Sequence, residues 1–564
     1  MSDNINPRTM NELDIALASL EPERWAQTSN QFRVSLLNEI ADATLAVSER
    51  WVASSVKHKG IASGSTLTGE EWFAGPAAVI AGCRQLAATI NDLPLKSFLN
   101  RLKSRRLKNG QLAVRVTPFN LYERILFSGT KADVWMQKGV NSDNLADNTA
   151  SAYDTFGETR SGKIALVLGA GNVSSIAPLD CLHKLFCEHQ AVVLKLNPVN
   201  DYLLEFLEEA LRPLVAINAL RIVRGDGSIG AYLCEHPSVS EIHITGAATT
   251  HDVIVWGAGE EGKLNKAKGE PRLKKQISSE LGGVTPTIVV PGPWQDRDIA
   301  YHAENIASQK LNNSGFNCIA AQMLIMPEQW DKSEQLLTAL EQAISQSEKR
   351  ELYYPGAETR IAEFKKRATT SNSGSFSGDQ TVVIAKLDKC VEHKDYFENT
   401  EVFAPALSVK SLHASTAEDY LLQAINYCND HLSGTLGANV IIHPKTMKLI
   451  GRERFEELIG ELRYGSIAIN GWVGLIYGLV RPPWGAFPGH TLEDVQSGTG
   501  TVHNTLMFDK TERSVVELPF RSFPKPVWFI SNKRAGVLGK LITDFLHTPS
   551  GWKIPRIVWH ALRG

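Results

Sequence analysis

One cysteine of the chain stands where nucleophilic chemistry could occur. Cys318 ends the stretch NSGFNC at residues 313–318, which follows a helical pattern and precedes an apolar strand-like run. An ionised thiol attacks carbonyl carbon atoms, but a lone cysteine is more often a small buried apolar side chain. The chain has seven cysteines, so residue type alone does not single out Cys318.

A carboxylate beside two glycines is the second candidate. Glu280 lies in the stretch SELGG, residues 279–283, at the end of a strand-like run. Such a glutamate could simply be exposed at a strand end, and the glycines could simply form a turn. If a thioester forms on a cysteine, however, a carboxylate can activate the water that releases it, and glycines let a cofactor approach the backbone closely.

A third candidate, GAGN at residues 169–172, directly follows the apolar run Ile164–Leu168. It invites comparison with the dinucleotide-binding pattern GxGxxG, but Ser174 occupies the third glycine position. The acidic residue expected at the end of the next strand is also absent, because Lys195 stands there. The segment therefore does not predict a conventional dinucleotide fingerprint.

Two α/β units are predicted to position these residues. From Lys163 onward, short apolar strands alternate with helices, which predicts a parallel sheet covered on both faces, with ligands at the carboxyl ends of its strands. A second unit of the same kind follows Gly283. The expected elements before Gly283 are the strands Ile164–Leu168, Ala191–Leu196, Leu220–Val223 and Glu241–Thr245 and the helices Pro178–Glu188 and Asp201–Ala216, the latter with Asp201 as N-cap. Those after Gly283 are the strands Thr287–Val290 and Met323–Met326 and the helices Asp298–Leu311 and Ser333–Lys349. Residues 1–160 read as mostly helical.

Three further segments have an unusual composition. Gly262–Lys275 carries six Lys or Arg residues and is predicted to be a solvated surface loop, and Ser371–Gln380 a second exposed loop. The tail Phe520–Gly564 carries about seven net positive charges and three tryptophans. Such a tail could make peripheral contact with an anionic membrane surface. We favour the alternative, a packed C-terminal subdomain or an oligomer contact with a basic rim.

Length and composition narrow the class of protein. A chain of 564 residues is too long for one core and predicts two to four domains. A net charge of −2 disfavours nucleic-acid binding. Seven cysteines without a CxxC pair indicate reduced thiols, and neither a signal peptide nor an apolar run of membrane-spanning length is recognised, so we expect a cytoplasmic protein. The scattered histidines predict no metal site.

Taken in chain order, the motifs resemble the aldehyde dehydrogenase superfamily over roughly residues 160–500. Any one of them is common by chance, but six or seven in the order and near the spacing of the family are not. They are Gly171-Asn172, Leu194-Lys195, Thr245-Gly246, Glu280 to Gly283, Asn313-x-Gly315-x-x-Cys318, Glu401-x-Phe403-x-Pro405, and Asn470 before Pro483-Trp484-Gly485.

The resemblance implies catalytic roles for three residues. Cys318 would attack an aldehyde carbonyl, which requires a thiolate and therefore implies a lowered pKa for this thiol. The backbone N–H of Cys318 and the side-chain amide of Asn172 would hold the oxyanion. Glu280 would activate the water that hydrolyses the thioester to a carboxylic acid.

The resemblance also implies NAD or NADP as the cofactor. The expected cofactor-binding residues are Lys195 at the adenosine ribose, Thr245 and Gly246 near the pyrophosphate, Leu281 and Gly282, Glu401 at the nicotinamide ribose, and Phe403 beside the ring. Pro198 stands where NAD-preferring members often carry an acidic residue, so NADP use stays open. His251 or a neighbour replaces the usual second glycine after Gly246, and Phe316 and Asn317 depart from the usual residues before the cysteine.

The implied fold is α/β and aldehyde-dehydrogenase-like, with two Rossmann-type α/β domains and a small β oligomerisation arm. The expected parts are a cofactor-binding domain (1–130 and 163–283), a catalytic domain (284–482), the arm (131–162 and 496–512) and a C-terminal extension (513–564). The family resemblance also implies a homodimer or homotetramer acting on a small aldehyde.

Two alternatives compete with this interpretation. An acylating aldehyde dehydrogenase, or acyl-CoA reductase, would pass the thioester from the same cysteine to coenzyme A. Such enzymes generally lack a base equivalent to Glu280, so its presence favours hydrolysis. A non-catalytic or membrane-tethered binding protein on the same scaffold is disfavoured, because Cys318, Glu280 and Asn172 are all present.

Overall fold

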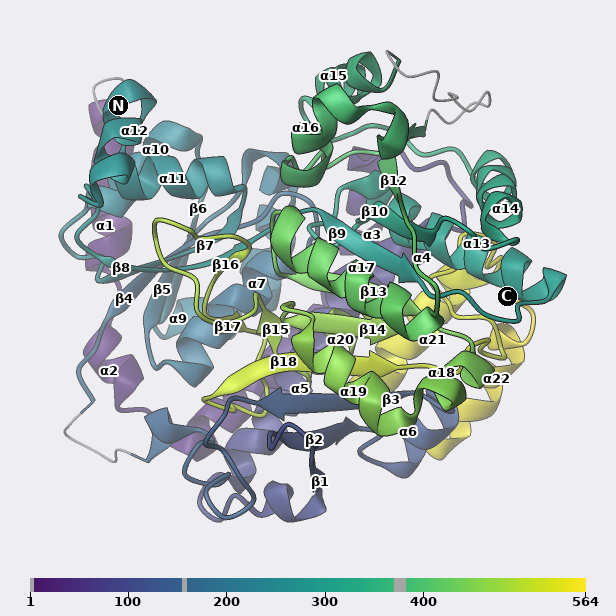
Figure 1. Ribbon diagram of the computed structural model, residues 1–564. Coiled ribbons are helices and arrows are strands. Elements are labelled where there is room, and N and C mark those ends of the chain that lie inside the picture. Colours follow the sequence, from purple (N-terminus) through teal and green to yellow (C-terminus); the bar gives the residue numbers. More distant parts are fainter. Residues whose placement is uncertain (1–4, 155–159, 370–381) are drawn as a thin grey trace.

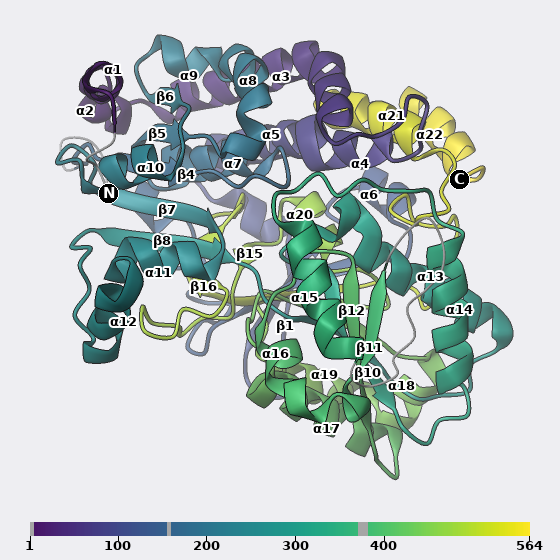
Figure 2. The ribbon, with the colours of Figure 1, turned by 90° about the horizontal axis from the view of Figure 1, so that it is seen from above.

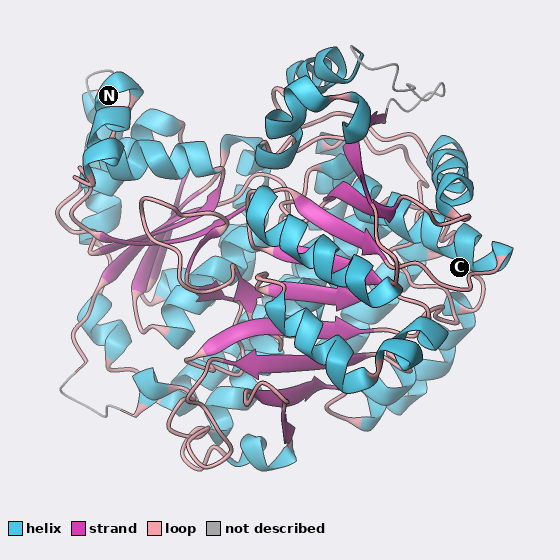
Figure 3. Cartoon of the chain, viewed as in Figure 1, coloured by secondary structure: helices cyan, strands magenta, loops and turns pink. Residues whose placement is uncertain are grey.

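Two β-sheets, each covered by helices, form the body of the protein. The computed structural model describes residues 5–154, 160–369 and 382–564 (Figure 1). The predicted loop Ser371–Gln380 lies outside the described residues. The strands gather into a smaller and a larger group with helices around both (Figure 3). The predicted α/β class is confirmed.

The smaller sheet has the order β16-β8-β7-β4-β5-β6. Its strands β4 to β8 run parallel, and the short β16 pairs antiparallel with β8. Runs of Val, Ile and Leu form the inner strands because helices cover both faces. The bounds are β4 Ile164–Leu168, β5 Ala191–Lys195, β6 Leu220–Val223, β7 Glu241–Gly246, β8 Gln276–Leu281 and β16 Gly498–Thr499. The four strands predicted before Gly283 therefore form within one residue of their expected ends.

The helices of this unit are α7 Ile176–Leu182, η5 His183–Cys187, η6 Pro198–Leu203, α8 Leu204–Ala210, α9 Arg212–Ala216, α10 Gly227–Glu235, α11 Ala248–Trp256 and α12 Gly259–Lys268. Two predictions were wrong in detail. Asp201 is not an N-cap, because a 3₁₀ turn begins earlier and Asn197 caps it by accepting from the Val199 N–H. Much of the predicted basic loop is helix α12, which has acidic residues in its first turn and basic ones in its last, as the helix dipole favours.

The larger sheet has the order β1-β2-β3-β18-β14-β13-β9-β10-β12-β11. The seven strands from β18 to β11 are parallel, and β1, β2 and β3 continue the sheet antiparallel. The bounds are β1 Lys103–Arg106, β2 Leu112–Thr117, β3 Lys131–Met136, β9 Thr285–Val289, β10 Ala321–Pro327, β11 Val383–Lys386, β12 Ala406–Leu412, β13 Gly437–Ile441, β14 Ser466–Ile469 and β18 Thr511–Glu517. A separate pair joins β15 Trp484–Gly485 to β17 Thr501–Val502.

The helices and short turns of the larger unit are α13 Asp296–Leu311, η7 Asn312–Gly315, α14 Ser333–Ser345, α15 Ala357–Thr369, η8 Leu387–Lys389, η9 Val391–His393, α16 Lys394–Asn399, α17 Ala417–His431, α18 Pro444–Ile450, α19 Arg452–Glu461 and α20 Gly474–Leu479. α13 and α14 form within a few residues of their expected bounds.

The strand pairing differs from the expected domain boundaries. β1 and β2 fall within the 1–130 part of the expected cofactor domain, yet they belong to the larger sheet. β3, at the start of the expected oligomerisation arm, pairs with β18 of the same chain. The boundary expected at 513 falls inside β18, which pairs with β14 in the sheet. The described strands of the arm therefore find hydrogen-bond partners within one chain.

N-terminal helices form the layer at the top of Figure 2, where α1 and α2 contact β6 and β5 of the smaller sheet and α3 packs against α5 and α8. They are α1 Pro7–Ala18, α2 Pro22–Ala26, α3 Asn30–His58, α4 Thr68–Trp72, η1 Phe73–Ala77 and α5 Ala78–Asp92, followed by η2 Ser97–Arg101, α6 Leu121–Leu126 and η3 Ser151–Tyr153. Within the described residues, one helical stretch, Thr68–Asp92, is long and apolar enough to cross a membrane. This stretch is an exception to the expectation that no run reaches membrane-spanning length. Of its most apolar window, 72% is buried inside the fold, as in a core helix.

The C-terminal extension packs against these helices. It forms α21 Ala535–His547, η10 Gly551–Lys553 and α22 Ile554–Ala561, and Figure 2 shows α21 beside α4. Gly539 lies so close to Trp72 that an added Cβ would be 2.5 Å from the tryptophan Cβ. The extension therefore forms a packed C-terminal subdomain, with Trp552 (94% exposed) and Trp559 (53% exposed) on its surface.

Candidate active site

A cleft of about 1440 Å³ runs along the carboxyl ends of the parallel strands in the smaller sheet and reaches the larger unit. Nine of the ten residues singled out in the sequence line this cleft. They are Asn172, Lys195, Thr245, Gly246, Glu280, Gly282, Cys318, Glu401 and Phe403. The exception is Leu281, whose side chain is buried and does not line the cleft.

Cys318 follows the turn η7 and precedes β10, and its thiol is partly exposed to the cleft. Its Sγ lies 3.7 Å from Oε1 of Glu280. Burial, followed by the nearby Glu280 and Glu401 carboxylates, raises the pKa of the Cys318 thiol well above its usual range. The expected lowering of this pKa was therefore wrong for the protein without ligand, because two acidic groups and little water surround the sulfur.

Glu280 is the next-to-last residue of β8 and is 2% exposed. Burial raises the pKa of its carboxyl, a tendency opposed by His503. Glu280 lies directly across from Thr245 in the register of β7 and β8. A carboxyl with a raised pKa is a stronger base than an exposed one, which is the property required of a general base.

Three polar groups converge on Asp180, close to Glu280. Asp180 is fully buried and accepts hydrogen bonds from Thr245 Oγ1 at 2.9 Å and from His503 Nε2 at 3.0 Å. His243 Nε2 lies 3.5 Å from the same carboxylate. These interactions hold the pKa of Asp180 well below its usual range, despite burial that acts in the opposite direction. The sequence analysis names Thr245 for another role and misses this cluster, because Asp180 lies more than 60 residues from each of its three partners.

Asn172 lies in the loop after β4, and its side-chain amide reaches the turn that carries the cysteine. Nδ2 of Asn172 donates to the carbonyl oxygen of Phe316 at 2.8 Å. Since a side-chain amide has two N–H groups, this bond leaves one donor for another acceptor. Asn172 is therefore fixed to the segment that ends at Cys318.

The turn before Cys318 is conformationally unusual. Asn313 and Ser314 have φ values of +52° and +56°, in the left-handed region that non-glycine residues seldom adopt. At Gly315, with φ of +79°, an added Cβ would lie 2.9 Å from the Ala404 backbone, so only glycine fits. Phe316, which departs from the family pattern, is fully buried with its ring centroid 5.8 Å from that of Phe403.

The carboxyl ends of β5 and β7 supply candidates for the adenosine end of a dinucleotide. Lys195 ends β5, and burial lowers the pKa of its ammonium group. Gly246 ends β7, and the first residues of α11, Ala248 to Thr250, line the cleft, where helix N–H groups favour anions. The Thr245 hydroxyl, however, is bonded to Asp180. His251 is fully buried, and neither ring nitrogen has a hydrogen-bond partner in the part of the chain that the structure describes.

Glu401 and Gly282 form a close contact on the opposite side of the cleft. A Cβ on Gly282 would lie 1.9 Å from Glu401 Oε1, so a side chain there would collide with the carboxylate. Burial raises the pKa of Glu401 to about 8, and Lys310 and Arg360 oppose the rise. Lys310 is itself buried, which lowers the pKa of its ammonium to about 7. Among the described residues, Glu401 Oε1 has no hydrogen-bond partner, so it is a ready acceptor for a ligand hydroxyl.

Basic residues of the predicted surface loop also line the cleft, namely Lys266, Arg272, Lys274 and Lys275. Their charge density was visible in the sequence, but the fold was needed to place them at the cleft. Two of them form ion pairs: Lys266 with Asp252 at 2.8 Å and Arg272 with Glu235 at 2.6 Å. Across the described ranges, no group of three or more His, Cys, Asp or Glu side chains could hold a metal ion.

Comparison with known proteins identifies a family. The family model described as "Aldehyde dehydrogenase family" matches residues 192–476. Aminoaldehyde dehydrogenase 1, peroxisomal, of Pisum sativum is 27% identical over 293 residues, which are 47% of this chain and 50% of that protein. D-glyceraldehyde dehydrogenase (NADP(+)) of Picrophilus torridus is 34% identical over 110 residues, 19% of each chain. The chain thus spans half or less of the length of these curated relatives.

Solved structures match over more of the chain. A putative aldehyde dehydrogenase from Burkholderia cenocepacia has a TM-score of 0.57 and 17% identity, covering 89% of this chain and 90% of that one. NADP-dependent glyceraldehyde-3-phosphate dehydrogenase from Bacillus halodurans, complexed with NADP, has a TM-score of 0.57 and 17% identity, covering 90% and 91%. At such identities the likeness shows the fold alone.

Proposed function

Because the chain belongs to the aldehyde dehydrogenase family, we propose that it oxidises an aldehyde to a carboxylic acid through a thioester on Cys318, with NAD or NADP as the acceptor. One observation supports this most directly. The Cys318 sulfur and the Glu280 carboxylate lie 3.7 Å apart in the same cleft, and Asn172 is bonded to the turn that carries the cysteine.

In the first step, Cys318 releases its thiol proton to solvent water, and Sγ forms a bond to the aldehyde carbon. The two electrons of the carbonyl π bond move to oxygen. The backbone N–H of Cys318 and the free N–H of the Asn172 amide stabilise this oxyanion, and each such donor is typically worth about 3 kcal/mol in acyl-transfer enzymes. When bound, the nicotinamide supplies the two-electron acceptor that converts the thiohemiacetal carbon to a thioester.

In the second step, Glu280 accepts a proton from water as the water oxygen bonds to the thioester carbon. The C–S bond then breaks, the carboxylic acid leaves, and the sulfur regains its starting state once Glu280 has returned its proton to solvent or to the thiolate. Burial supports this role, because a carboxyl with a raised pKa binds the transferred proton more firmly than an exposed one.

The described residues fit a nicotinamide dinucleotide. Glu401 Oε1 is a buried acceptor without a partner in the described chain, as a ribose hydroxyl requires. A side chain at Gly282 would fill the space beside it. Lys195 supplies a cation at the other end of the cleft, where the N-terminus of α11 also faces the ligand. These groups would bind and orient the dinucleotide relative to Cys318, with Phe403 flanking the ring.

We further propose that NADP is accepted. Pro198 leaves the position three residues after Lys195 without a carboxylate that would repel a 2′-phosphate. Lys274 and Lys275 add positive charge to the lining of the cleft. Steady-state KM values for NAD and NADP, measured side by side, test this, and strict preference for NAD would contradict it.

The acylating alternative uses the same cysteine but a different acyl acceptor. The position of Glu280 beside Cys318 favours water. The test is NAD(P)H formation from a panel of aliphatic, aromatic and semialdehyde substrates, with and without coenzyme A. Turnover without coenzyme A and release of free acid would support the proposal, whereas strict dependence on coenzyme A would replace it with the acylating reaction.

We also propose a membrane contact, an oligomeric state and a cellular location for this protein. The exposure of Trp552 and Trp559 on a basic tail favours a peripheral contact of residues 520–564 with anionic membranes. Flotation with phosphatidylserine vesicles, with and without Trp552→Ser, tests it. We also propose a homodimer or homotetramer, by the family resemblance, and a cytoplasmic location. Analytical ultracentrifugation and cell fractionation test these two points.

A further inference from the structure

A buried ion pair lies behind the loop that carries Asn172. Lys59 is the C-cap of α3, and Glu71 lies in α4. Their side chains are 5% and 2% exposed, and Nζ of Lys59 lies 2.8 Å from Oε1 of Glu71. Taking two charges out of water costs free energy, which the pair recovers only with good geometry and further hydrogen bonds. The other contacts of the Lys59 ammonium therefore show what the pair holds in place.

Every proton of the Lys59 ammonium has an acceptor. Besides Glu71, Nζ donates to the backbone carbonyl of Asn172 at 3.2 Å and to Oδ1 of Asn313 at 3.0 Å. An ammonium group has three N–H donors and no acceptor, so these three bonds use it fully. One buried cation thus joins the N-terminal helices to the Asn172 loop and to the turn before Cys318.

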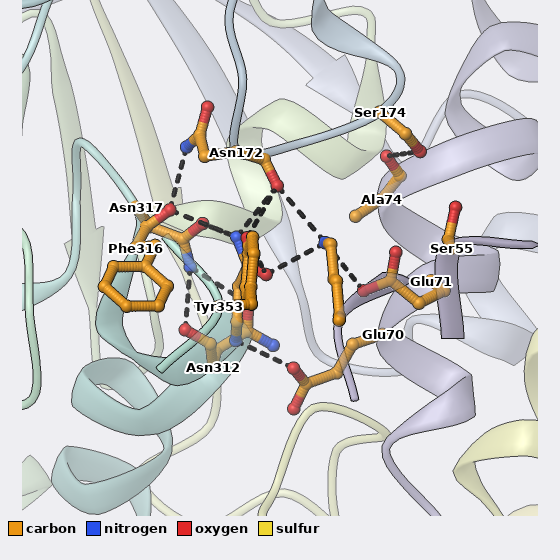
Figure 4. Close-up of polar contacts among 12 residues, drawn as sticks. Ser55, Glu70, Glu71, Ala74, Asn172, Ser174, Asn312, Phe316, Asn317 and Tyr353 are labelled. Carbon is orange, nitrogen blue, oxygen red and sulfur yellow. Dashed lines mark hydrogen bonds and ion pairs between the residues drawn. The ribbon is translucent and has the colours of Figure 1, made fainter. Parts of the chain in front are cut away.

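The Asn172 carbonyl is the meeting point of the network (Figure 4). It accepts from Lys59 and from Nδ2 of Asn313 at 3.1 Å, and the Tyr353 hydroxyl lies 3.1 Å away. That hydroxyl is also 2.8 Å from Oδ1 of Asn313, and its single proton serves one acceptor at a time. Since three donors converge on one carbonyl oxygen, the peptide plane of Asn172 has little freedom to turn.

The same network holds the strained turn at Asn313. The backbone N–H of Asn313 donates to Oε2 of Glu70 at 2.7 Å. The Arg350 guanidinium donates to both carboxylate oxygens of Glu70, at 2.7 and 3.0 Å. Left-handed backbone is strained in a non-glycine residue and persists only where the surroundings fix it. The contacts of Asn313 therefore supply that constraint.

We infer that Lys59, Glu71 and Tyr353 are positioning residues that hold the oxyanion-binding amide of Asn172 in register with Cys318. The link to the sulfur is short, because Nδ2 of Asn172 donates to the Phe316 carbonyl, two residues before the cysteine. This inference rests on the proposed function, since an oxyanion forms only if Cys318 attacks a carbonyl. None of the three side chains lines the cleft, so they act through Asn172 and the turn.

The kinetic test is a double-mutant cycle between Tyr353→Phe and Asn172→Ala. Tyr353→Phe removes one hydroxyl and should lower kcat roughly tenfold with the KM for NAD(P) unchanged, because deleting an oxyanion donor outright costs about 10²–10³ in kcat. In the Asn172→Ala background the same change should have little further effect. Equal losses of kcat in both backgrounds would overturn the inference.

A matched control is Tyr420→Phe. Tyr420 is also buried and donates its hydroxyl to a backbone carbonyl, that of Ile325 at 2.8 Å, away from the cleft. The Tyr420→Phe variant should lower the midpoint of thermal unfolding about as much as Tyr353→Phe does. It should leave kcat unchanged. Lys59→Arg should keep most of the kcat that Lys59→Met loses, because the cation is retained.

An activity-independent measurement separates this inference from the proposed function. Hydrogen–deuterium exchange of the peptides that contain Asn172 and Asn313 should be faster in Tyr353→Phe and Lys59→Met than in wild type and in Tyr420→Phe. If the wild type oxidises no aldehyde, the proposed function fails while the exchange result still stands. If these two peptides stay as protected as in wild type, the positioning role is excluded.

Discussion

The sulfur of Cys318 lies 3.7 Å from Oε1 of Glu280, so the candidate nucleophile and the candidate base are in contact before any substrate arrives. The contact favours the protonated thiol, since a carboxylate beside a sulfur opposes formation of a second negative charge. Both groups are also desolvated, which raises both pKa values. The surroundings of Cys318 therefore favour the thiol over the thiolate.

This contact predicts slow alkylation of Cys318 at neutral pH. The pKa of the thiol is raised well above its usual value of 9.0. The rate with iodoacetamide should therefore rise about tenfold per pH unit up to pH 9 without a plateau, because only the thiolate reacts. Glu280→Gln should increase the rate at a fixed pH, since it removes the negative charge. Mass spectrometry of the Cys318 peptide measures both, and a plateau below pH 7 would contradict the prediction.

Glu280→Gln should also separate the two chemical steps. Thioester formation does not require the carboxylate, so a burst of NAD(P)H near one equivalent per active site should remain. Steady-state turnover should fall by about 10²–10⁴-fold, the usual contribution of a general base. Rapid-mixing absorbance at the nicotinamide band shows both phases. Loss of the burst together with the steady state would place Glu280 in the first step instead.

Glu401→Gln should weaken the dependence of stability on pH. The folded protein keeps the Glu401 proton up to a pKa of about 8, whereas the unfolded chain releases it near 4.5. The folded state therefore binds more protons in this window, and the free energy of unfolding from this group falls as pH rises. Between about pH 4.5 and about pH 7, Glu401 contributes to this slope and Lys310 does not yet titrate.

In that window Glu401→Gln should flatten the slope of unfolding free energy against pH, measured by urea denaturation. It should also raise the KM for NAD(P) several-fold, because an amide nitrogen with two N–H donors replaces one carboxyl oxygen. The neighbouring exposed acid Glu392 offers the control, since Glu392→Gln changes the same charge outside the cleft. A slope that is identical in wild type and Glu401→Gln would show that Glu401 ionises normally in the folded state.

Gly539→Leu should destabilise the protein through the C-terminal subdomain. A Cβ at Gly539 would lie 2.5 Å from the Cβ of Trp72, so the larger side chain forces α21 away from α4. Overpacking of this kind typically costs about 1–3 kcal/mol. Gly551→Leu adds the same side chain where no atom lies within 4 Å and should cost far less. Denaturation midpoints compare the two, and equal midpoints would show that α21 is not docked in solution.

The chain order of short motifs was enough to predict much of this protein. The runs Ile164–Leu168 and Leu220–Val223 form strands with the predicted bounds, because continuous Val, Ile and Leu suit a sheet covered on both faces. Nine of the ten predicted site residues also line one cleft. Such features can be predicted from local patterns, because residues close in the sequence determine where a strand ends and where a glycine turn forms.

Contacts between distant segments were decided by the tertiary structure alone. The raised pKa of Cys318 depends first on burial and then on Glu280 and Glu401. These two residues are 38 and 83 positions away in the sequence, and no local pattern encodes that environment. The Lys59–Asn172 contact spans 113 positions. The pairing of β3 with β18 likewise joins segments that are far apart in the sequence. The sequence therefore identified the chemical groups, and the fold decided which groups surround each of them.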